Sequence, residues 1–181
     1  MKKRYKILAS IVAFVLLFLC LYKPIYKMIY PLKYEEYILQ YSGEYGLDKF
    51  LVMAVIKAES NYQHDANSGV ARGLMQITDQ TAQWIAKKMD IAYSSDDIKD
   101  PRTNINMGCF YLRYLIDYYN NDVSLALAAY NAGMGNVDKW LKNPDYSKDS
   151  KTLYKIPFEE TRKYLLKVEK GVRVYQKLYK E

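Results

Sequence analysis

Cysteine and histidine are scarce in this sequence, which limits the chemistry that it can carry. The 181 residues include two cysteines and one histidine. Cys20 and Cys109 lie in segments that we expect to be far apart, so no disulfide can form within the chain. His64 stands in a polar stretch without a neighbouring cysteine. The sequence therefore predicts no metal site and no cysteine–histidine nucleophile.

Acidic residues are missing from the first 33 positions, which hold seven lysines and arginines. Those seven account for the whole formal net charge of +7, so residues 34–181 carry 20 basic and 20 acidic groups. A formally neutral domain lacks the basic surface that nucleic-acid binding requires. We therefore expect no nucleic-acid partner.

Charge is also missing from Ile7 to Tyr22, sixteen residues that follow the basic cluster KKRYK. This pattern predicts a segment that inserts into a membrane. As a helix it would measure about 24 Å against a hydrocarbon core of about 30 Å, a shortfall that Lys23 can cover with its long side chain. No small-residue cleavage pattern follows, and Phe18 and Leu19 precede Cys20 where lipoprotein processing needs small residues. An uncleaved anchor is favoured, although cleavage stays open.

The basic cluster before the apolar run is denser than the lysines after it, and this asymmetry predicts the orientation of the anchor. We expect a single-pass protein of the cell membrane, with its N-terminus in the cytoplasm and residues 34–181 outside. The chain then divides into an anchor and linker, 1–33, and one globular domain, 34–181.

The domain shows helical periodicity and neither sustained strand alternation nor an internal repeat, so we expect a mostly α fold. Asp48, Asp100 and Asp122 stand where helix N-caps are expected, and Gly46 and Gly133 stand where helices end. We expect helices at 34–45, 49–60, from Thr78 or Asp79 to 88, 101–119, 123–132, around 137–141 and from Pro157 onward, with loops at 61–73 and 143–156.

Glu59 is the first residue whose surroundings indicate chemistry. It follows the run from Phe50 to Ile56, which is too apolar to face water, and it lies near the C-terminal end of the predicted helix. Burial and the negative end of the helix dipole both disfavour an ionised carboxylate, so the sequence predicts a raised pKa for Glu59. A carboxyl that holds its proton near neutral pH can act as a general acid. Position alone also fits a plainer interpretation, in which Glu59 reaches the surface as the helix ends.

Five short segments then follow in a recognisable order. They are Glu59-Ser60, GLMQI at 73–77, NINMGCFYL at 104–112, AAYNAG at 128–133 and IPFEETRKY at 156–164. Together they resemble the catalytic domain of the soluble lytic transglycosylase family, relatives of goose-type lysozyme that cut the glycan strands of bacterial peptidoglycan. The resemblance extends from about Tyr37 to Tyr175 and implies a lysozyme-like fold.

The resemblance also implies roles for individual residues. Glu59 matches the single catalytic acid of the family, and Tyr130 is expected near its carboxyl. The expected substrate-binding residues are Ser60, Ser68, Gln76, Tyr130, Asn131 and Glu160. Structural alternatives remain for three of them. Tyr130 is one of 20 tyrosines, most of which must serve packing. Asn131 could serve solely as the end of a helix, and Glu160 could serve solely to complement a helix dipole.

Two positions depart from the family pattern. Val70 stands where the family often has glycine, and the loop from Ser68 to Gly73 looks about one residue short. Asp79 replaces a proline that commonly follows the Met-Gln pair. Outside the motifs, Trp84 and Trp140 could line a sugar groove or belong to the core.

The resemblance implies a mechanism without any cofactor. Protonated Glu59 would donate to the oxygen that links N-acetylmuramic acid to N-acetylglucosamine, while the substrate's own acetamido group supports the positive charge. The ionised Glu59 would then accept the proton of the C6 hydroxyl as that oxygen closes on C1, which leaves a 1,6-anhydro end.

Two alternatives stay open: a hydrolytic muramidase on the same fold, and a non-catalytic wall-binding scaffold. An anchored domain would serve local cell-wall remodelling, with an envelope-spanning apparatus as a possible partner.

Overall fold

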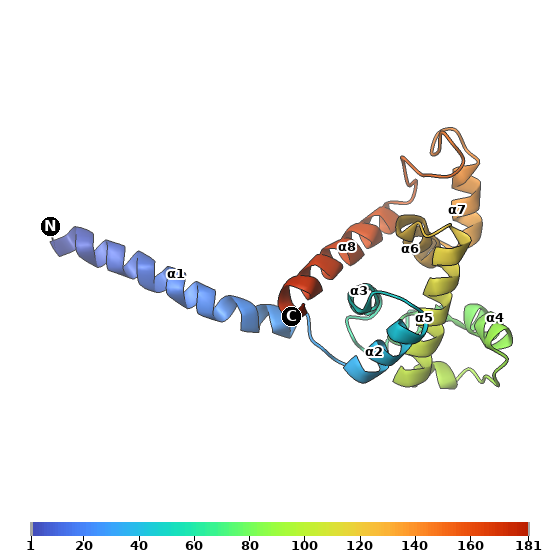
Figure 1. Ribbon diagram of the computed structural model, residues 1–181, viewed down its shortest axis with the longest axis horizontal. Coiled ribbons are helices and arrows are strands. Elements are labelled where there is room, and N and C mark those ends of the chain that lie inside the picture. Colours follow the sequence, from blue (N-terminus) through green and yellow to red (C-terminus); the bar gives the residue numbers. More distant parts are fainter. Residues whose placement is uncertain (1, 181) are drawn as a thin grey trace.

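The computed structural model describes residues 2–180 as one long helix and a helical domain (Figure 1). The expected mostly α fold is confirmed. The elements are α1 (Lys2–Ile29), α2 (Glu35–Glu44), α3 (Lys49–Glu59), β1 (Ala71–Arg72), β2 (Ile77–Thr78), α4 (Asp79–Met89), the short 3₁₀ helix η1 (Asp97–Lys99), α5 (Pro101–Tyr118), α6 (Val123–Ala132), α7 (Met134–Leu141) and α8 (Glu159–Tyr179).

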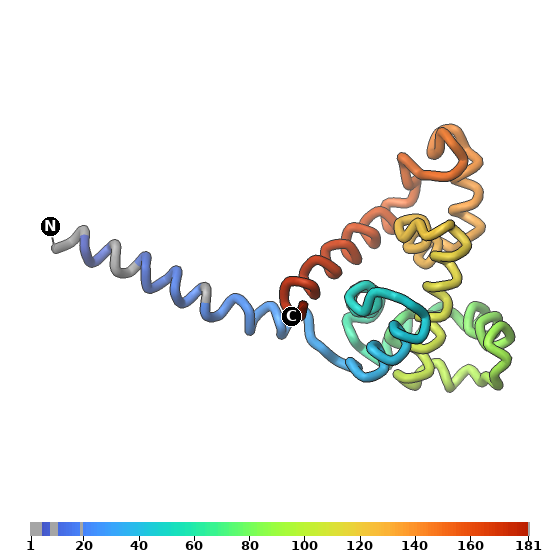
Figure 2. The backbone as a smooth tube through the Cα atoms, in the orientation of Figure 1, coloured from blue at the N-terminus to red at the C-terminus, as the bar shows by residue number. Residues whose placement is uncertain are grey.

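Helix α3 is the central element of the domain. All residues from Phe50 to Ile56 are buried, as their continuous apolar character predicts. The helix packs between α8 and α2 (Figure 2). Gly171 of α8 permits the close approach, because a Cβ atom there would stand 2.9 Å from the Cβ of Ala54. This packing fixes the end of α3, and with it Glu59, relative to α8.

The expected N-caps are confirmed. The side chain of Asp48 accepts from the backbone N–H of Phe50 at 2.7 Å, and Asp100 and Asp122 cap α5 and α6 in the same way. At the start of α4, where two caps were open, the Thr78 hydroxyl accepts from the N–H of Thr81. Each cap sets the point at which a loop turns into a helix beside the site.

The structure corrects three boundaries. Residues 71–72 pair antiparallel with 77–78, although the sequence predicted a loop and no strand; two-residue strands are too short to show alternation. Helix α7 starts directly after Gly133 and is longer than the expected turn. Helix α8 starts at Glu159 and not at Pro157, because the Arg162 guanidinium donates to the carbonyls of Ile156 and Pro157 and holds that segment outside the helix.

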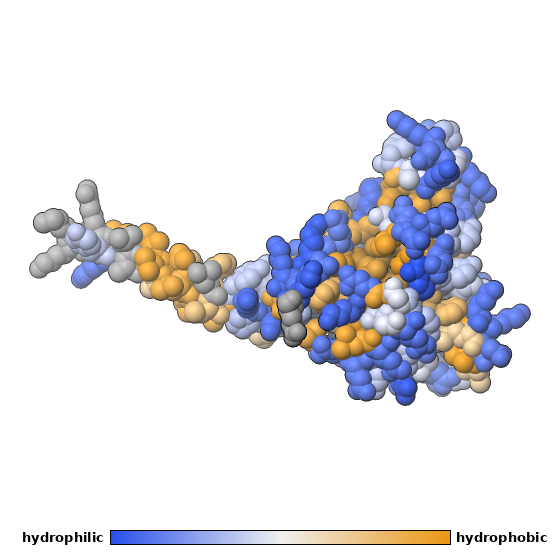
Figure 3. Space-filling model, viewed as in Figure 1, coloured by the Kyte–Doolittle hydropathy of each residue, from blue (hydrophilic) through white to orange (hydrophobic). Residues whose placement is uncertain are grey.

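Helix α1 leaves the domain as a separate rod (Figure 1). It continues past Pro24 to Ile29 and is long and apolar enough to cross a membrane. Figure 3 shows its apolar stretch outside the mixed surface of the domain. At its base the ring of Tyr30 meets Tyr175 edge-on at 5.4 Å, and the Tyr179 hydroxyl donates to the Tyr30 carbonyl at 2.7 Å. The helix is therefore fastened to the end of α8.

Candidate active site

Glu59 is the last residue of α3, and the sequence predicted a position near the C-terminal end of this helix. Burial raises the pKa of its carboxyl from the ordinary 4.5 to about 7. The expectation of a raised pKa is therefore confirmed. A substantial share of the carboxyl therefore stays protonated near neutral pH, which is the state that a general acid needs.

Two tyrosines approach this carboxyl from different helices. Burial, and then the negative charge of Glu59, raise the pKa of the Tyr130 hydroxyl well above its ordinary range, and the same two causes act on Tyr164. Tyr130 comes from α6 and Tyr164 from α8. The placement of Tyr130 close to Glu59 agrees with what the resemblance implied.

The Tyr164 hydroxyl is buried and lies near enough to Glu59 to lower its pKa as a donor. Within residues 2–180 it nevertheless has no hydrogen-bond partner of ordinary geometry. A buried hydroxyl without a partner is costly. It therefore stands ready to donate when Glu59 becomes a carboxylate.

Two charged side chains of α8 act on Glu59 in opposite directions. The Lys167 ammonium lowers the pKa of Glu59, and the negative charge of Glu160 raises it. Lys167 also donates to the Ala58 carbonyl at 2.5 Å, so it satisfies an acceptor at the end of α3. A cation at the C-terminal end of a helix is favourable, and here it adjoins the catalytic candidate.

The GLMQ segment at 73–76 is held from three directions. The buried Ser60 hydroxyl donates to the Leu74 carbonyl at 2.8 Å. Asn104 accepts from the N–H of Met75 at 2.7 Å, and the Tyr130 hydroxyl donates to the Met75 carbonyl at 2.8 Å. The segment therefore links α3, α5 and α6 beside Glu59.

Two glycines make that approach possible. Gly73 has a φ of +77°, and a Cβ atom there would stand 2.1 Å from the Asn104 amide nitrogen. A Cβ at Gly108 of α5 would stand 2.3 Å from the sulfur of Met75. Both positions exclude a side chain because Asn104 and Met75 occupy the space.

Gln76 uses its side chain to close the loop that precedes it. Its amide nitrogen donates to the carbonyls of Ala66 at 3.1 Å and Gly73 at 2.9 Å. Its backbone has a φ of +47°, a strained conformation for a residue with a side chain. The two hydrogen bonds stabilise this strained backbone conformation at Gln76, a residue that the resemblance assigns to substrate binding.

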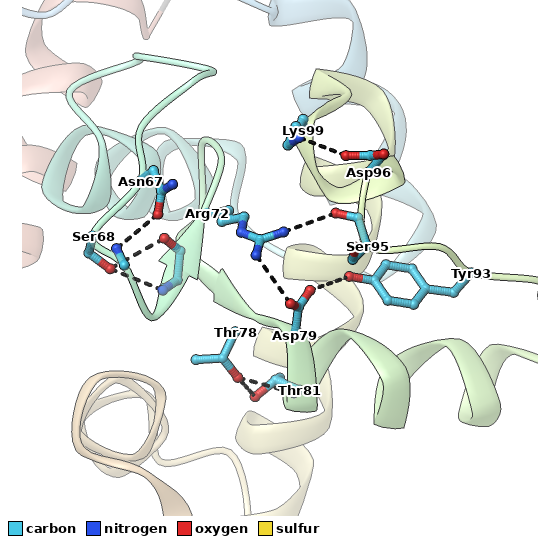
Figure 4. A network of polar contacts seen from close by, with 12 residues as sticks. Asn67, Ser68, Arg72, Thr78, Asp79, Thr81, Tyr93, Ser95, Asp96 and Lys99 are labelled. Atoms are coloured by element: carbon cyan, nitrogen blue, oxygen red, sulfur yellow. Dashed lines mark hydrogen bonds and ion pairs between the residues drawn. The ribbon is translucent and has the colours of Figure 1, made fainter.

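Ser68 lies in the exposed turn before β1, where its hydroxyl accepts from the Ala71 N–H and donates to the Ala71 carbonyl (Figure 4). Among the residues that the structure describes, it has no hydrogen bond to the other predicted site residues. The same view shows what Asp79 does in place of the family's proline. Asp79 pairs with Arg72 at 3.3 Å and accepts from the Tyr93 hydroxyl at 3.1 Å, which fastens the hairpin to the segment before α5.

Asn131 and Glu160 are joined through a third residue. The buried Thr161 hydroxyl donates to the Asn131 side chain at 2.8 Å, which connects α6 to the first turn of α8. Glu160, next to Thr161, is exposed. The structure therefore places Glu59, Ser60 and Tyr130 around the GLMQ segment, which contains Gln76. Glu160 lies in the first turn of α8, and Asn131 lies on α6 in contact with that turn.

Sequence reasoning missed three residues of this site. Asn104 and Tyr164 stand inside two of the quoted motifs, NINMGCFYL and IPFEETRKY, but neither received a role. Lys167 lies outside the motifs, so no signal in the sequence indicated it. Within residues 2–180, no group of three His, Cys, Asp or Glu side chains could hold a metal ion.

Comparison with known proteins gives a consistent result. A family model described as "Transglycosylase SLT domain" matches residues 36–153. Soluble lytic murein transglycosylase of Escherichia coli strain K12 is 37% identical over 145 residues, which cover 78% of this chain and 22% of that protein. Membrane-bound lytic murein transglycosylase C of Histophilus somni is 30% identical over 162 residues, covering 77% of this chain and 45% of that protein.

The crystal structure of the 70-kDa soluble lytic transglycosylase of Escherichia coli superposes with a TM-score of 0.74 at 34% identity, covering 84% of this chain and 25% of the other. The expected lysozyme-like fold is thereby confirmed. The chain spans between a fifth and a half of the length of these curated relatives. It belongs to the transglycosylase SLT domain family.

Proposed function

We propose that this chain is a peptidoglycan lytic transglycosylase in which Glu59 is the single catalytic acid. The observation that carries the proposal is a carboxyl with a pKa of about 7 at the end of α3, flanked by the hydroxyls of Tyr130 and Tyr164. The names of the relatives, soluble and membrane-bound lytic murein transglycosylases, support the same reaction. The substrate is the bond from N-acetylmuramic acid to N-acetylglucosamine.

The reaction proceeds in two proton transfers through one carboxyl. Glu59 gives its proton to the glycosidic oxygen as the C1–O bond breaks and the electron pair leaves with N-acetylglucosamine. The acetamido oxygen of N-acetylmuramic acid supports C1. Glu59 then accepts the proton of the C6 hydroxyl as that oxygen bonds to C1, which forms the 1,6-anhydro ring and restores the acid. No water is consumed.

The surroundings of Glu59 suit both transfers. Burial keeps the carboxyl protonated before the first step, and the Tyr164 hydroxyl and the Lys167 ammonium stabilise the carboxylate that exists between the steps. Ser60 and Tyr130 hold the backbone that leads into Gln76, the residue that we assign to contact with the glycan strand. The roles of Ser68, Asn131 and Glu160 in substrate binding stay predictions.

A cleavage assay with product analysis tests this proposal. Glu59→Gln should lower the release of soluble fragments from purified peptidoglycan by at least about 10³-fold, within the range for a lost general acid. Glu159→Gln is the matched control, because Glu159 is exposed and pairs with Lys163 on the same helix. Wild-type products should carry anhydro ends, one water lighter than reducing ends in mass spectrometry. Reducing ends would overturn the transglycosylase reaction in favour of hydrolysis, and an active Glu59→Gln protein would overturn the assignment of Glu59.

The second part of the proposal concerns the membrane. The apolar helix α1 and a relative named as membrane-bound support an anchor. We place the N-terminus in the cytoplasm and the domain at the wall, because the denser basic cluster precedes the apolar run. An anchored domain can reach only the cell wall close to the membrane, and this restriction suits local remodelling.

Labelling of intact cells tests the topology. Cys109 is fully buried and Cys20 lies in the span, so the wild-type protein gives a low background. A membrane-impermeant maleimide should label Ser150→Cys, which lies in the exposed loop before α8. Labelling that appears only after the cells are lysed would place the domain in the cytoplasm and overturn the proposed orientation.

A further inference from the structure

A pocket of about 240 Å³ lies between the first turns of α4 and α7, beside α5. Helices α4 and α7 lie toward opposite ends of α5 on the same side of the domain (Figure 1). The residues that line the pocket are Gln80, Thr81, Trp84, Tyr111 and Met134. None of the residues assigned to catalysis above lines it.

A chain of aromatic ring contacts links the pocket to the neighbourhood of Glu59. The ring of Tyr130, the neighbour of Glu59, lies 5.5 Å from the ring of Tyr111. The ring of Tyr111 lies 6.0 Å from Trp84 in an edge-to-face arrangement. Gln80 and Thr81 follow shortly after the GLMQ segment, and Met134 follows the AYNAG segment. The two motifs that flank Glu59 therefore lead directly into the two walls of the pocket.

The two tryptophans of the chain differ in their surroundings. Trp140 is buried, with 6% of its surface exposed, and packs against Phe158 at 4.9 Å. Trp84 is only half-buried. The centroid of its ring lies 4.7 Å from that of Tyr114 and 5.8 Å from the Lys88 ammonium, and both neighbours hold the ring in place. Trp140 therefore belongs to the core, whereas Trp84 presents a fixed ring at the pocket.

The chemistry of the lining indicates the class of ligand. Aromatic rings favour the apolar C–H face of a sugar, while the exposed Gln80 amide can bond to ring hydroxyls or an acetamido group. Met134 adds an adaptable apolar contact. None of the five lining residues is charged, which favours a neutral sugar over the charged stem peptide. The volume is below that of drug-sized sites, as a single ring requires.

We propose that this pocket is a distal saccharide subsite, in which one pyranose ring of the glycan strand stacks on Trp84. The inference rests on the proposed function, because it places a further ring of the glycan strand beside the two motifs that flank Glu59. It makes Trp84 a residue that determines the strand length at which binding becomes strong.

Titration with chito-oligosaccharides of two to six N-acetylglucosamine units tests the subsite. The full chain in detergent carries Glu59→Gln, so the oligomers are not cleaved. Long oligomers should protect Trp84 from quenching by acrylamide, because Trp140 is buried and contributes little. Trp84→Ala should lower the affinity for the longest oligomer by about tenfold, as the loss of one stacked ring predicts. The affinity for the shortest oligomer should not change.

Two further variants keep the test independent of folding. Trp84→Tyr retains a ring and should restore most of the affinity, and Gln80→Ala alters an exposed side chain and should weaken long oligomers alone. The subsite would be overturned if adding Trp84→Ala or Gln80→Ala to the Glu59→Gln protein left its affinity for every oligomer unchanged. If the wild-type protein still cleaved peptidoglycan in that case, the proposed function would stand; if binding depended on Trp84 but no wall were cleaved, the proposed function would fail alone.

Discussion

Replacing Glu59 by glutamine should stabilise the folded protein at alkaline pH. A carboxyl whose pKa is about 7 when folded and 4.5 ordinarily binds its proton more tightly in the folded state. Its ionisation then opposes folding: the penalty is absent below pH 4.5, grows between the two values and is complete above pH 7. Glutamine is neutral at every pH and removes this penalty.

The difference of 2.5 between those two pKa values sets an upper bound of about 3.4 kcal/mol. Because Glu59 is half-buried, water screens part of the effect, and we expect about 1–2 kcal/mol at pH 8. Urea unfolding of the full chain in detergent, followed by tryptophan fluorescence, measures the free energy of unfolding from pH 4 to pH 9.

The matched control is Glu159→Gln, which alters an exposed carboxyl. Its stability should follow that of the wild-type protein at every pH. The Glu59→Gln advantage should disappear below pH 4.5. An equal advantage at pH 4 and pH 8 would refute the reasoning, since uncharged packing and not ionisation would then be its source.

Four other variants test the neighbours of Glu59. Lys167→Met removes a cation that lowers the pKa of Glu59, so the alkaline fall of the cleavage rate should move up by about half a pH unit, and an unchanged profile would exclude that role. Tyr164→Phe should not lower the melting temperature, because the hydroxyl that it removes is buried without a partner, but it should lower the cleavage rate about tenfold, because that hydroxyl stabilises the Glu59 carboxylate. Asn104→Ala should cost about 2–4 kcal/mol in urea unfolding, because it strands buried backbone groups. Gly108→Ala should cost about 1–3 kcal/mol in the same assay, because a Cβ displaces Met75.

Local signals in the sequence were enough for the helices and for the acid. The caps at Asp48 and Asp100 depend on residues two or three positions away, and each was found from the sequence. Glu59 could be identified because the apolar run before it predicts burial, and burial is the main cause of its raised pKa. Neither inference needs knowledge of distant parts of the chain.

Distant contacts explain what the sequence did not reveal. The Lys167 side chain meets the carbonyl of Ala58 across 109 positions, and Tyr130 meets Met75 across 55. No periodicity in a helix reports such a partner. The hairpin at 71–78 was missed for a related reason, since its strands are two residues long and are held by Arg72 and Asp79 rather than by a hydrophobic pattern.

The central claim is that the pKa of Glu59 lies near 7 inside the folded protein. A carbon-13 NMR titration of the glutamate side chains, with Glu59→Gln used to assign the signal, measures this directly. One carboxyl should titrate near pH 7 in the wild-type spectrum, and this signal should be missing from the variant. A Glu59 signal that titrates near its ordinary pKa of 4.5 would contradict it.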